Sequence, residues 1–218
     1  DELIQNDGGT SEHRFRVATR ALAAYVGVQG RIDPAEWTDL VVRIGEEMIT
    51  AAGDAPQKQQ VQWELGMALY DAVQIYQMRG QHDESLKYGE KAIAYLEAAR
   101  TSKDAPADAY LLGRLYFRVG SIHAIARQNH RAAVTWFDKA APVLIQAIPQ
   151  VAPFELGRLG ETFVSMGVSY WETGQRNTAV KLTQQGVELM EKAVKDGQLA
   201  NTALDLSLIH ISEPTRPY

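Results

Sequence analysis

The chain has 218 residues, a formal net charge of −5 at pH 7, 45% hydrophobic residues and no cysteine. This length supplies enough apolar sequence for a buried core in one compact domain, two small ones or a short helical array. The acidic balance argues against general nucleic-acid binding, which depends on phosphate neutralisation. The lack of cysteine excludes disulfides, thiolate zinc sites, iron–sulfur clusters and a cysteine nucleophile.

The beginning of the chain, Asp1-Glu2-Leu3, has neither an initiator Met nor the basic and apolar segments of a signal peptide. We interpret the sequence as a fragment of a longer protein, with residues 1–11 as a disordered segment or linker and residues 12–205 as a helical domain. No apolar run approaches the roughly 20 residues that a membrane helix needs. We therefore expect a cytoplasmic protein, or the soluble part of a larger one, that contacts no membrane.

Four turn-like sites, centred on residues 30, 80, 128 and 174, divide the helical domain at spacings of 50, 48 and 46 residues. Each turn lies between segments with apolar residues at i, i+3, i+4 and i+7, the spacing of amphipathic helices. Small residues stand at matched points on both sides of each turn, as two closely packed antiparallel helices require. No alternating run indicates a strand. The pattern predicts an all-α fold of four hairpins, at about residues 12–53, 57–100, 106–148 and 153–196.

Two irregularities fall in the third hairpin. Its turn has no glycine, and its first helix aligns with the fourth repeat at an offset of 47 residues, whereas its second helix aligns at 46. We therefore expect this turn to hold one extra residue. Pro142 lies inside the predicted second helix, where we expect it to kink or end the helix.

The segment after Asp205 differs in character from the helical pattern. The string from Leu206 to Arg216 resembles an in-frame translation of a sequencing adapter, so we interpret residues 206–218 as a non-native tail and exclude His210, Ser212 and Glu213 from any site. A natural irregular C-terminus is the alternative.

Residues 167–180, Gly-Val-Ser-Tyr-Trp-Glu-Thr-Gly-Gln-Arg-Asn-Thr-Ala-Val, carry a small residue, a Tyr, a turn Gly and a packing Ala at the offsets of a tetratricopeptide repeat (TPR). Residues 78–93 and 133–140 match this pattern again, so the chain resembles a TPR protein whose period exceeds the usual ~34 residues. The resemblance implies a right-handed α-solenoid of about four antiparallel helical hairpins. It also implies a concave groove, lined by the first helix of each hairpin, that binds a peptide or partner protein.

A basic stretch lies in the third hairpin, because no acidic residue occurs between Asp108 and Asp138 while four Arg and two His do. By resemblance, one TPR subclass holds a peptide's terminal carboxylate at the positions of Arg114 and Arg118, and Arg20 matches a third basic position of that subclass. Ala24 and Asp71 stand where that clamp uses Asn, so we favour a looser site for acidic segments over a specific clamp. The alternative is that these Arg side chains are solvated or paired with acids of neighbouring helices.

Counting back from each turn predicts which side chains of the first helices face the groove. The predicted peptide-binding residues are Tyr70, Gln74, Gln77, Arg114, Phe117, Arg118, Ser121 and Trp171. The same frame adds an apolar set, Met67, Met78, Ala124, Ile125, Val164 and Val168. The alternative for each residue is packing against the next repeat.

Motifs for nucleotide binding, zinc proteolysis, serine hydrolysis and calcium binding do not occur in the sequence. His123 and His130 are seven residues apart but straddle a turn, and the carboxylate pairs Glu46-Glu47 and Glu188/Glu191 are expected on solvated helix faces. We therefore predict no catalytic residue, no metal and no cofactor. The preferred hypothesis is a non-catalytic interaction scaffold. The alternatives are a regulatory or self-association segment of a larger signalling protein and an enzyme without a familiar motif.

Overall fold

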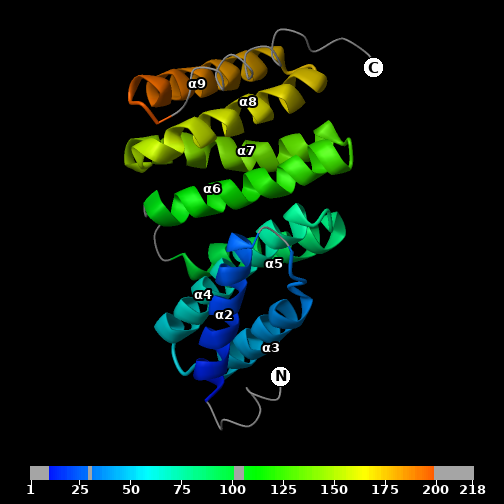
Figure 1. Cartoon of the computed structure of the whole chain (residues 1–218), viewed down its shortest axis with the longest axis vertical. Helices are drawn as coiled ribbons and strands as arrows, with labels where there is room; N and C mark the ends of the chain where they lie inside the picture. The colour runs from blue at the N-terminus through cyan, green and yellow to red at the C-terminus, as the bar shows by residue number, and fades with distance from the viewer. Residues whose placement is uncertain (1–9, 29–30, 101–105, 199–218) are drawn as a thin grey trace. The chain divides into compact units, whose positions relative to one another are not determined.

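The computed structural model describes residues 10–28, 31–100 and 106–198 of the chain. These residues form eight α-helices and no strand, so the all-α class is confirmed (Figure 1). The chain divides into two compact units, Asp1–Lys103 and Asp104–Tyr218, which we describe separately. The predicted tail at 206–218, the turn residue Gly30 and residues 1–9 of the predicted linker lie outside the described residues.

The first unit contains two helical hairpins. Its helices are α2 (Ser11–Gly27), α3 (Ala35–Ala51), α4 (Ala55–Met78) and α5 (His82–Ala99). Helix α2 packs against both α3 and α4, so the two hairpins share one core. The largest fully buried side chains of this unit come from α2, α3, α4 and α5 and are Phe15, Leu22, Ile44, Leu65, Leu69, Ile75, Tyr76 and Leu96.

Side-chain caps and glycines fix the ends of these helices. The Thr10 hydroxyl and the Asp54 carboxylate accept hydrogen bonds from the backbone N–H of the third residue after them, so α2 begins inside the predicted linker. At the other end of α4, Gly80 has a φ of +72°, and the Gln81 N–H donates to Tyr76 O. This is the left-handed glycine cap that ends a helix and turns the chain back.

The second hairpin is closed by small residues at the predicted positions. The Ser85 hydroxyl on α5 donates to Val73 O on α4 at 3.1 Å, and Tyr76 stacks on Tyr88 with ring centroids 5.4 Å apart. The first hairpin is different, because Ala23 and Ala35, the corresponding small residues, are exposed. The predicted repeat frame therefore describes the packing of α4 and α5 but not that of α2 and α3.

The second unit also contains two hairpins. Its elements are α6 (Pro106–Ser121), the π-helical turn η1 (Ile122–Ala126), α7 (His130–Ala147), the 3-10 turns η2 (Ile148–Gln150) and η3 (Pro153–Glu155), α8 (Leu156–Glu172) and α9 (Arg176–Lys195). Helices α8 and α9 lie side by side (Figure 1). Gly174 caps α8 with a φ of +81°, as Gly80 caps α4.

Two glycines set the crossing of α8 and α9. A Cβ on Gly160 would lie 2.6 Å from Gly186 O, and a Cβ on Gly186 would lie 2.6 Å from Gly160 O. Nearer the turn, a Cβ on Gly167 would lie 3.1 Å from Ala179 O. The backbones of the two helices therefore touch along their length, which only residues without side chains permit.

The third hairpin closes without glycine. The Arg127 N–H donates to Ile122 O and the Asn129 N–H donates to His123 O, so each hydrogen-bonded ring is one residue wider than in the glycine-capped helices. The expected extra residue is thus accommodated in the π-helical turn η1 rather than in the connection itself. Gln128 follows with a φ of +49°, the left-handed region that usually requires glycine.

Helix α7 is continuous through Pro142, so of the two expected outcomes, a kink or an end of the helix, the end is wrong. Proline removes the N–H that would bond to Asp138 O. Pro142 is exposed on the solvent side of α7, where water can satisfy that carbonyl, so the helix continues.

Candidate functional site

The predicted site residues fall into two sets, one in each unit. Tyr70, Gln74 and Gln77 lie on α4 of the first unit, and all three are half-buried. Met78 follows them with 50% of its surface exposed. This helix therefore offers an amide- and methionine-rich surface, with Asp71 half-buried on the same helix. Arg20, the proposed third basic position, is exposed on α2 of this unit.

The second set begins on α6. The Arg114 guanidinium lies 5.7 Å from the Tyr110 ring centroid and donates to the Tyr110 hydroxyl at 3.1 Å. Arg118 follows one turn later and is half-buried. An Arg that stacks on an aromatic ring keeps its orientation, so less rotamer freedom is lost when it binds a carboxylate.

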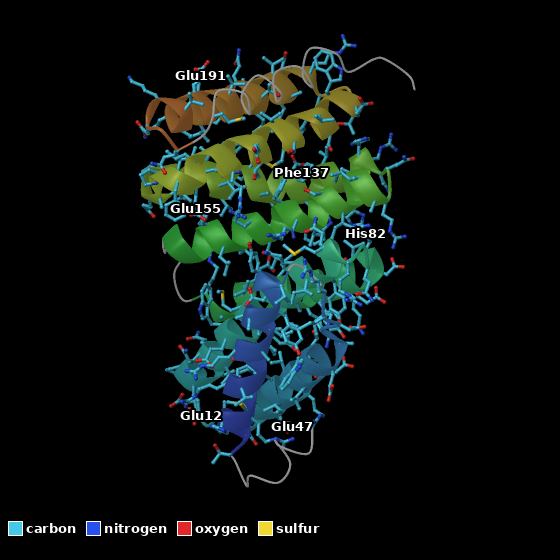
Figure 2. All side chains as sticks on the ribbon, viewed as in Figure 1. Glu12, Glu47, His82, Phe137, Glu155 and Glu191 are labelled. Carbon is cyan, nitrogen blue, oxygen red and sulfur yellow. The ribbon has the colours of Figure 1, made fainter. Side chains whose placement is uncertain are left out.

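Phe117 and Ser121 have more interior roles than Arg114. The Phe117 ring stacks on Phe137 of α7, labelled in Figure 2, with centroids 5.8 Å apart. Ser121 is 8% exposed. Phe117 is therefore partly used in packing against α7 and exposes only the rest of its surface to a ligand. Ser121 exposes little surface.

Trp171 is the site residue on α8, and α8 contacts α6. Its indole is 41% exposed, and the Arg176 guanidinium lies 5.2 Å from the ring centroid. Val168, one turn earlier, is 46% exposed, and Ile125 on η1 is 78% exposed. We define the first-helix face of the second unit by Arg114, Phe117, Arg118, Ile125, Val168 and Trp171.

A cavity of about 760 Å³ lies where the third hairpin turn meets the end of α8. Its lining residues are Arg127, Gln128, Asn129, His130, Arg131, Glu172 and Thr173, and we call it the turn-edge cavity. Sequence reasoning identified the basic residues but did not gather them into a site. The lack of any acid between Asp108 and Asp138 was the signal, and the neighbouring position of Glu172 came only from the packing of α7 on α8.

The two histidines considered for metal binding have different surroundings. The Nδ1 of His130 lies 3.0 Å from the Ser169 hydroxyl and joins the start of α7 to α8. His123 lies in η1, on the other side of the turn. Within residues 10–28, 31–100 and 106–198, no group of three or more His, Asp or Glu has a metal-binding arrangement.

The carboxylate pair Glu46-Glu47 borders a hollow of about 610 Å³ on α3. Hydrogen bonds from Lys91, at 2.9 Å, and Tyr95, at 2.8 Å, hold the pKa of Glu46 below its usual value. A carboxyl group that donates protons in catalysis needs the opposite shift. Glu46 is therefore an ionised structural partner that joins α3 to α5.

Tyrosine hydroxyls make similar links elsewhere. Tyr88 of α5 donates to Asp39 of α3 at 2.9 Å, and Tyr170 of α8 donates to Asp138 of α7 at 2.7 Å. Burial, reinforced by these hydrogen bonds to carboxylates, raises the pKa of both tyrosines well above the usual value. These neutral phenols hold neighbouring hairpins together within each unit.

None of the described helices is both long enough and apolar enough to cross a membrane. No protein-family model matches the sequence, and a search of curated proteins gives no significant match. The interpretation of the site therefore depends on its geometry.

Proposed function

We propose that the chain is a non-catalytic interaction scaffold of TPR type, a right-handed α-solenoid that binds a peptide or partner protein through its first helices. The observation that carries this proposal is the composition of the first-helix face of the second unit. Three exposed apolar side chains, Ile125, Val168 and Trp171, accompany two arginines there. An aromatic anchor with neighbouring arginines is the composition typical of binding hot spots.

The spacing of the apolar residues supports a peptide ligand. Val168 and Trp171 are three residues apart on α8 and so lie on one side of that helix. Val168 corresponds to Ser121 of α6 at the offset of 47 residues that relates the two helices. A bound helix or extended segment can insert apolar anchors between such positions.

The charge of the same face favours an acidic ligand. Arg114 is held in place by Tyr110, and Arg118 lies one turn away on α6. Bidentate contacts from such arginines suit carboxylates. A specific two-carboxylate clamp is not part of the proposal, because Ala24 and Asp71 lack the amides it would need.

A pair of matched variants tests the proposal. Val168 on α8 and Val180 on α9 are the same residue with the same exposed fraction, 46%, but only Val168 belongs to the first-helix face. Peptides selected from a display library against the protein should bind Val168→Ser and Trp171→Ala at least about fivefold more weakly than the unmodified protein, measured by fluorescence anisotropy. Val180→Ser should bind as the unmodified protein does.

Equal losses in Val168→Ser and Val180→Ser would contradict binding on this face. A regulatory or self-association segment is the alternative. Sedimentation at high protein concentration tests this alternative by measuring whether the protein forms oligomers. Self-association through the first-helix face would be weakened by the same Val168→Ser variant.

A further inference from the structure

The turn-edge cavity is a second candidate binding site, separate from the first-helix face. We propose that it binds an oxyanion group, phosphoryl or carboxylate, carried by the peptide ligand. The inference that the group belongs to a peptide rests on the proposed function. The inference that the cavity binds oxyanions rests on the cavity alone.

Charge is the first argument. Two arginines, Arg127 and Arg131, line the cavity, against one carboxylate, that of Glu172. Arg131 is exposed, and among the described residues its side chain makes no hydrogen bond or ion pair. A cavity with this lining attracts anions, and a guanidinium is a bidentate donor for phosphoryl and carboxylate oxygens.

The hydrogen-bonding state of the other lining residues is the second argument. Ser169 is 1% exposed, and its hydroxyl has no partner in the described part of the chain other than His130 Nδ1. This contact uses Nδ1, so Nε2 is the ring nitrogen of His130 that is left for a ligand. The Asn129 side-chain oxygen accepts from the Ala132 N–H, so that side chain has its amide N–H groups left to donate. Asn129 thus offers donors rather than an acceptor to a ligand in the cavity.

The backbone of this turn is the third argument. Of the three hairpin turns that the structure describes completely, this is the one with a π-helical turn and a non-glycine residue at positive φ, Gln128. Both features cost conformational energy, and both are concentrated at functional sites in proteins. Arg127 and Asn129, which flank Gln128 in the sequence, both line the cavity.

Three peptides of one sequence test the proposal. Each carries the same apolar anchors and, at one position, phosphoserine, Asp or Ser, and binding is measured by fluorescence anisotropy at fixed ionic strength. The unmodified protein should prefer the phosphoserine or the Asp peptide over the Ser peptide. Whichever of the two is preferred identifies the source of the oxyanion, and equal affinity for all three overturns the proposal.

Two cavity variants should then act in opposite directions. Arg131→Gln should reduce the preference for the anionic peptide about three- to tenfold, because one charged donor is lost. Glu172→Gln should increase it by a similar factor, because the one carboxylate of the cavity is neutralised. Lys192→Gln on α9 is the control, since it removes one positive charge from an exposed position outside the cavity. Equal effects of Arg131→Gln and Lys192→Gln would overturn the proposal.

A last measurement separates this proposal from the proposed function. Inorganic phosphate alone, titrated while the amide resonances of residues 127–131 are followed by NMR, reports on the cavity without any peptide. If no peptide binds but phosphate shifts these resonances, the peptide-binding function fails and the cavity remains an oxyanion site. If peptides bind and depend on Val168 but not on Arg131 or Glu172, the cavity proposal alone fails.

Discussion

The third and fourth hairpins belong to one unit but close their helix pairs in different ways. Between α8 and α9, Gly174 makes the turn, and Gly160 and Gly186 bring the two backbones into contact. Between α6 and α7, a π-helical turn and Gln128 make the connection. The glycine hairpin is the less strained of the two. The other turn is strained and carries basic and amide side chains.

The largest expected effect is at the glycine crossing. A Cβ on Gly160 would meet backbone atoms, Gly186 O at 2.6 Å and Met190 N at 3.2 Å, which cannot move aside. We expect Gly160→Ala to lower the free energy of unfolding by about 3 kcal/mol, the upper end of overpacking costs. Urea unfolding followed by circular dichroism measures this loss.

Gly113→Ala is the matched control, at the corresponding position of α6. A Cβ there would meet the flexible Leu144 side chain, at 2.9 Å, which can change rotamer. This variant should lose at most about 1 kcal/mol. Equal losses at Gly113 and Gly160 would contradict the difference between the two hairpins.

Tyr170 tests how the two hairpins are held to each other. Its hydroxyl donates to the Asp138 carboxylate, so Tyr170→Phe removes one charge-assisted hydrogen bond. We expect a loss of about 1.5 kcal/mol. Ala179→Ser changes a buried residue of α9 that takes no part in this bond, so its loss of stability shows the effect of a buried substitution alone. If Tyr170→Phe unfolds at the same urea concentration as the unmodified protein, the bond does not contribute to stability.

The pH dependence of stability extends this test to the first unit. Burial, and then the hydrogen bond to Glu46, raises the pKa of Tyr95 to about 12, from 10.0 for the free side chain. Because the folded pKa is the higher one, the stabilisation is complete below about pH 10 and is lost as the pH rises toward 12. Tyrosinate absorbance and circular dichroism should therefore change together over this interval. Tyr95→Phe should reduce the dependence of the free energy of unfolding on pH over this interval.

The smallest expected effects are at the turns, and they have opposite signs. Nothing lies within 4 Å of a Cβ on Gly174, so Gly174→Ala strains only the backbone and should cost about 1 kcal/mol. Gln128→Gly should stabilise the protein by about 0.5 kcal/mol, because it relieves a left-handed residue. The midpoint of thermal unfolding should fall in Gly174→Ala and rise in Gln128→Gly. A destabilised Gln128→Gly would mean that its side chain contributes more than its backbone costs.

Features that depend on local sequence were predicted well. The turns at Gly80 and Gly174 were located from their recurrence between amphipathic segments, and the apolar spacing was sufficient for the all-α class. The extra residue of the third hairpin was also predicted, from the different offsets, 47 and 46 residues, at which its two helices align with the fourth repeat. Its place in a π-helical turn was not, because a wider hydrogen-bonded ring leaves no composition signal.

Some contacts between helices were not predicted, although the small residues that close the second hairpin were. The burial of Ser121 and the stacking of Phe117 on Phe137 follow from the rotation of α6 against α7. The continuity of α7 depends on Pro142 facing solvent rather than a neighbouring helix. The turn-edge cavity forms where the turn at residues 127–131 lies beside the end of α8 at Glu172 and Thr173. These segments are about 40 residues apart in the sequence, and a repeat pattern does not predict that they are neighbours.

The position of Trp171 has an optical consequence. Of the four tryptophans, Trp37, Trp63 and Trp136 are half-buried, and Trp171 is the most exposed. The Arg176 cation above its ring should draw iodide toward it, so this anionic quencher should act mainly on Trp171 and leave the emission of the other three largely unchanged. The protein therefore contains its own fluorescent reporter for whatever covers the end of α8.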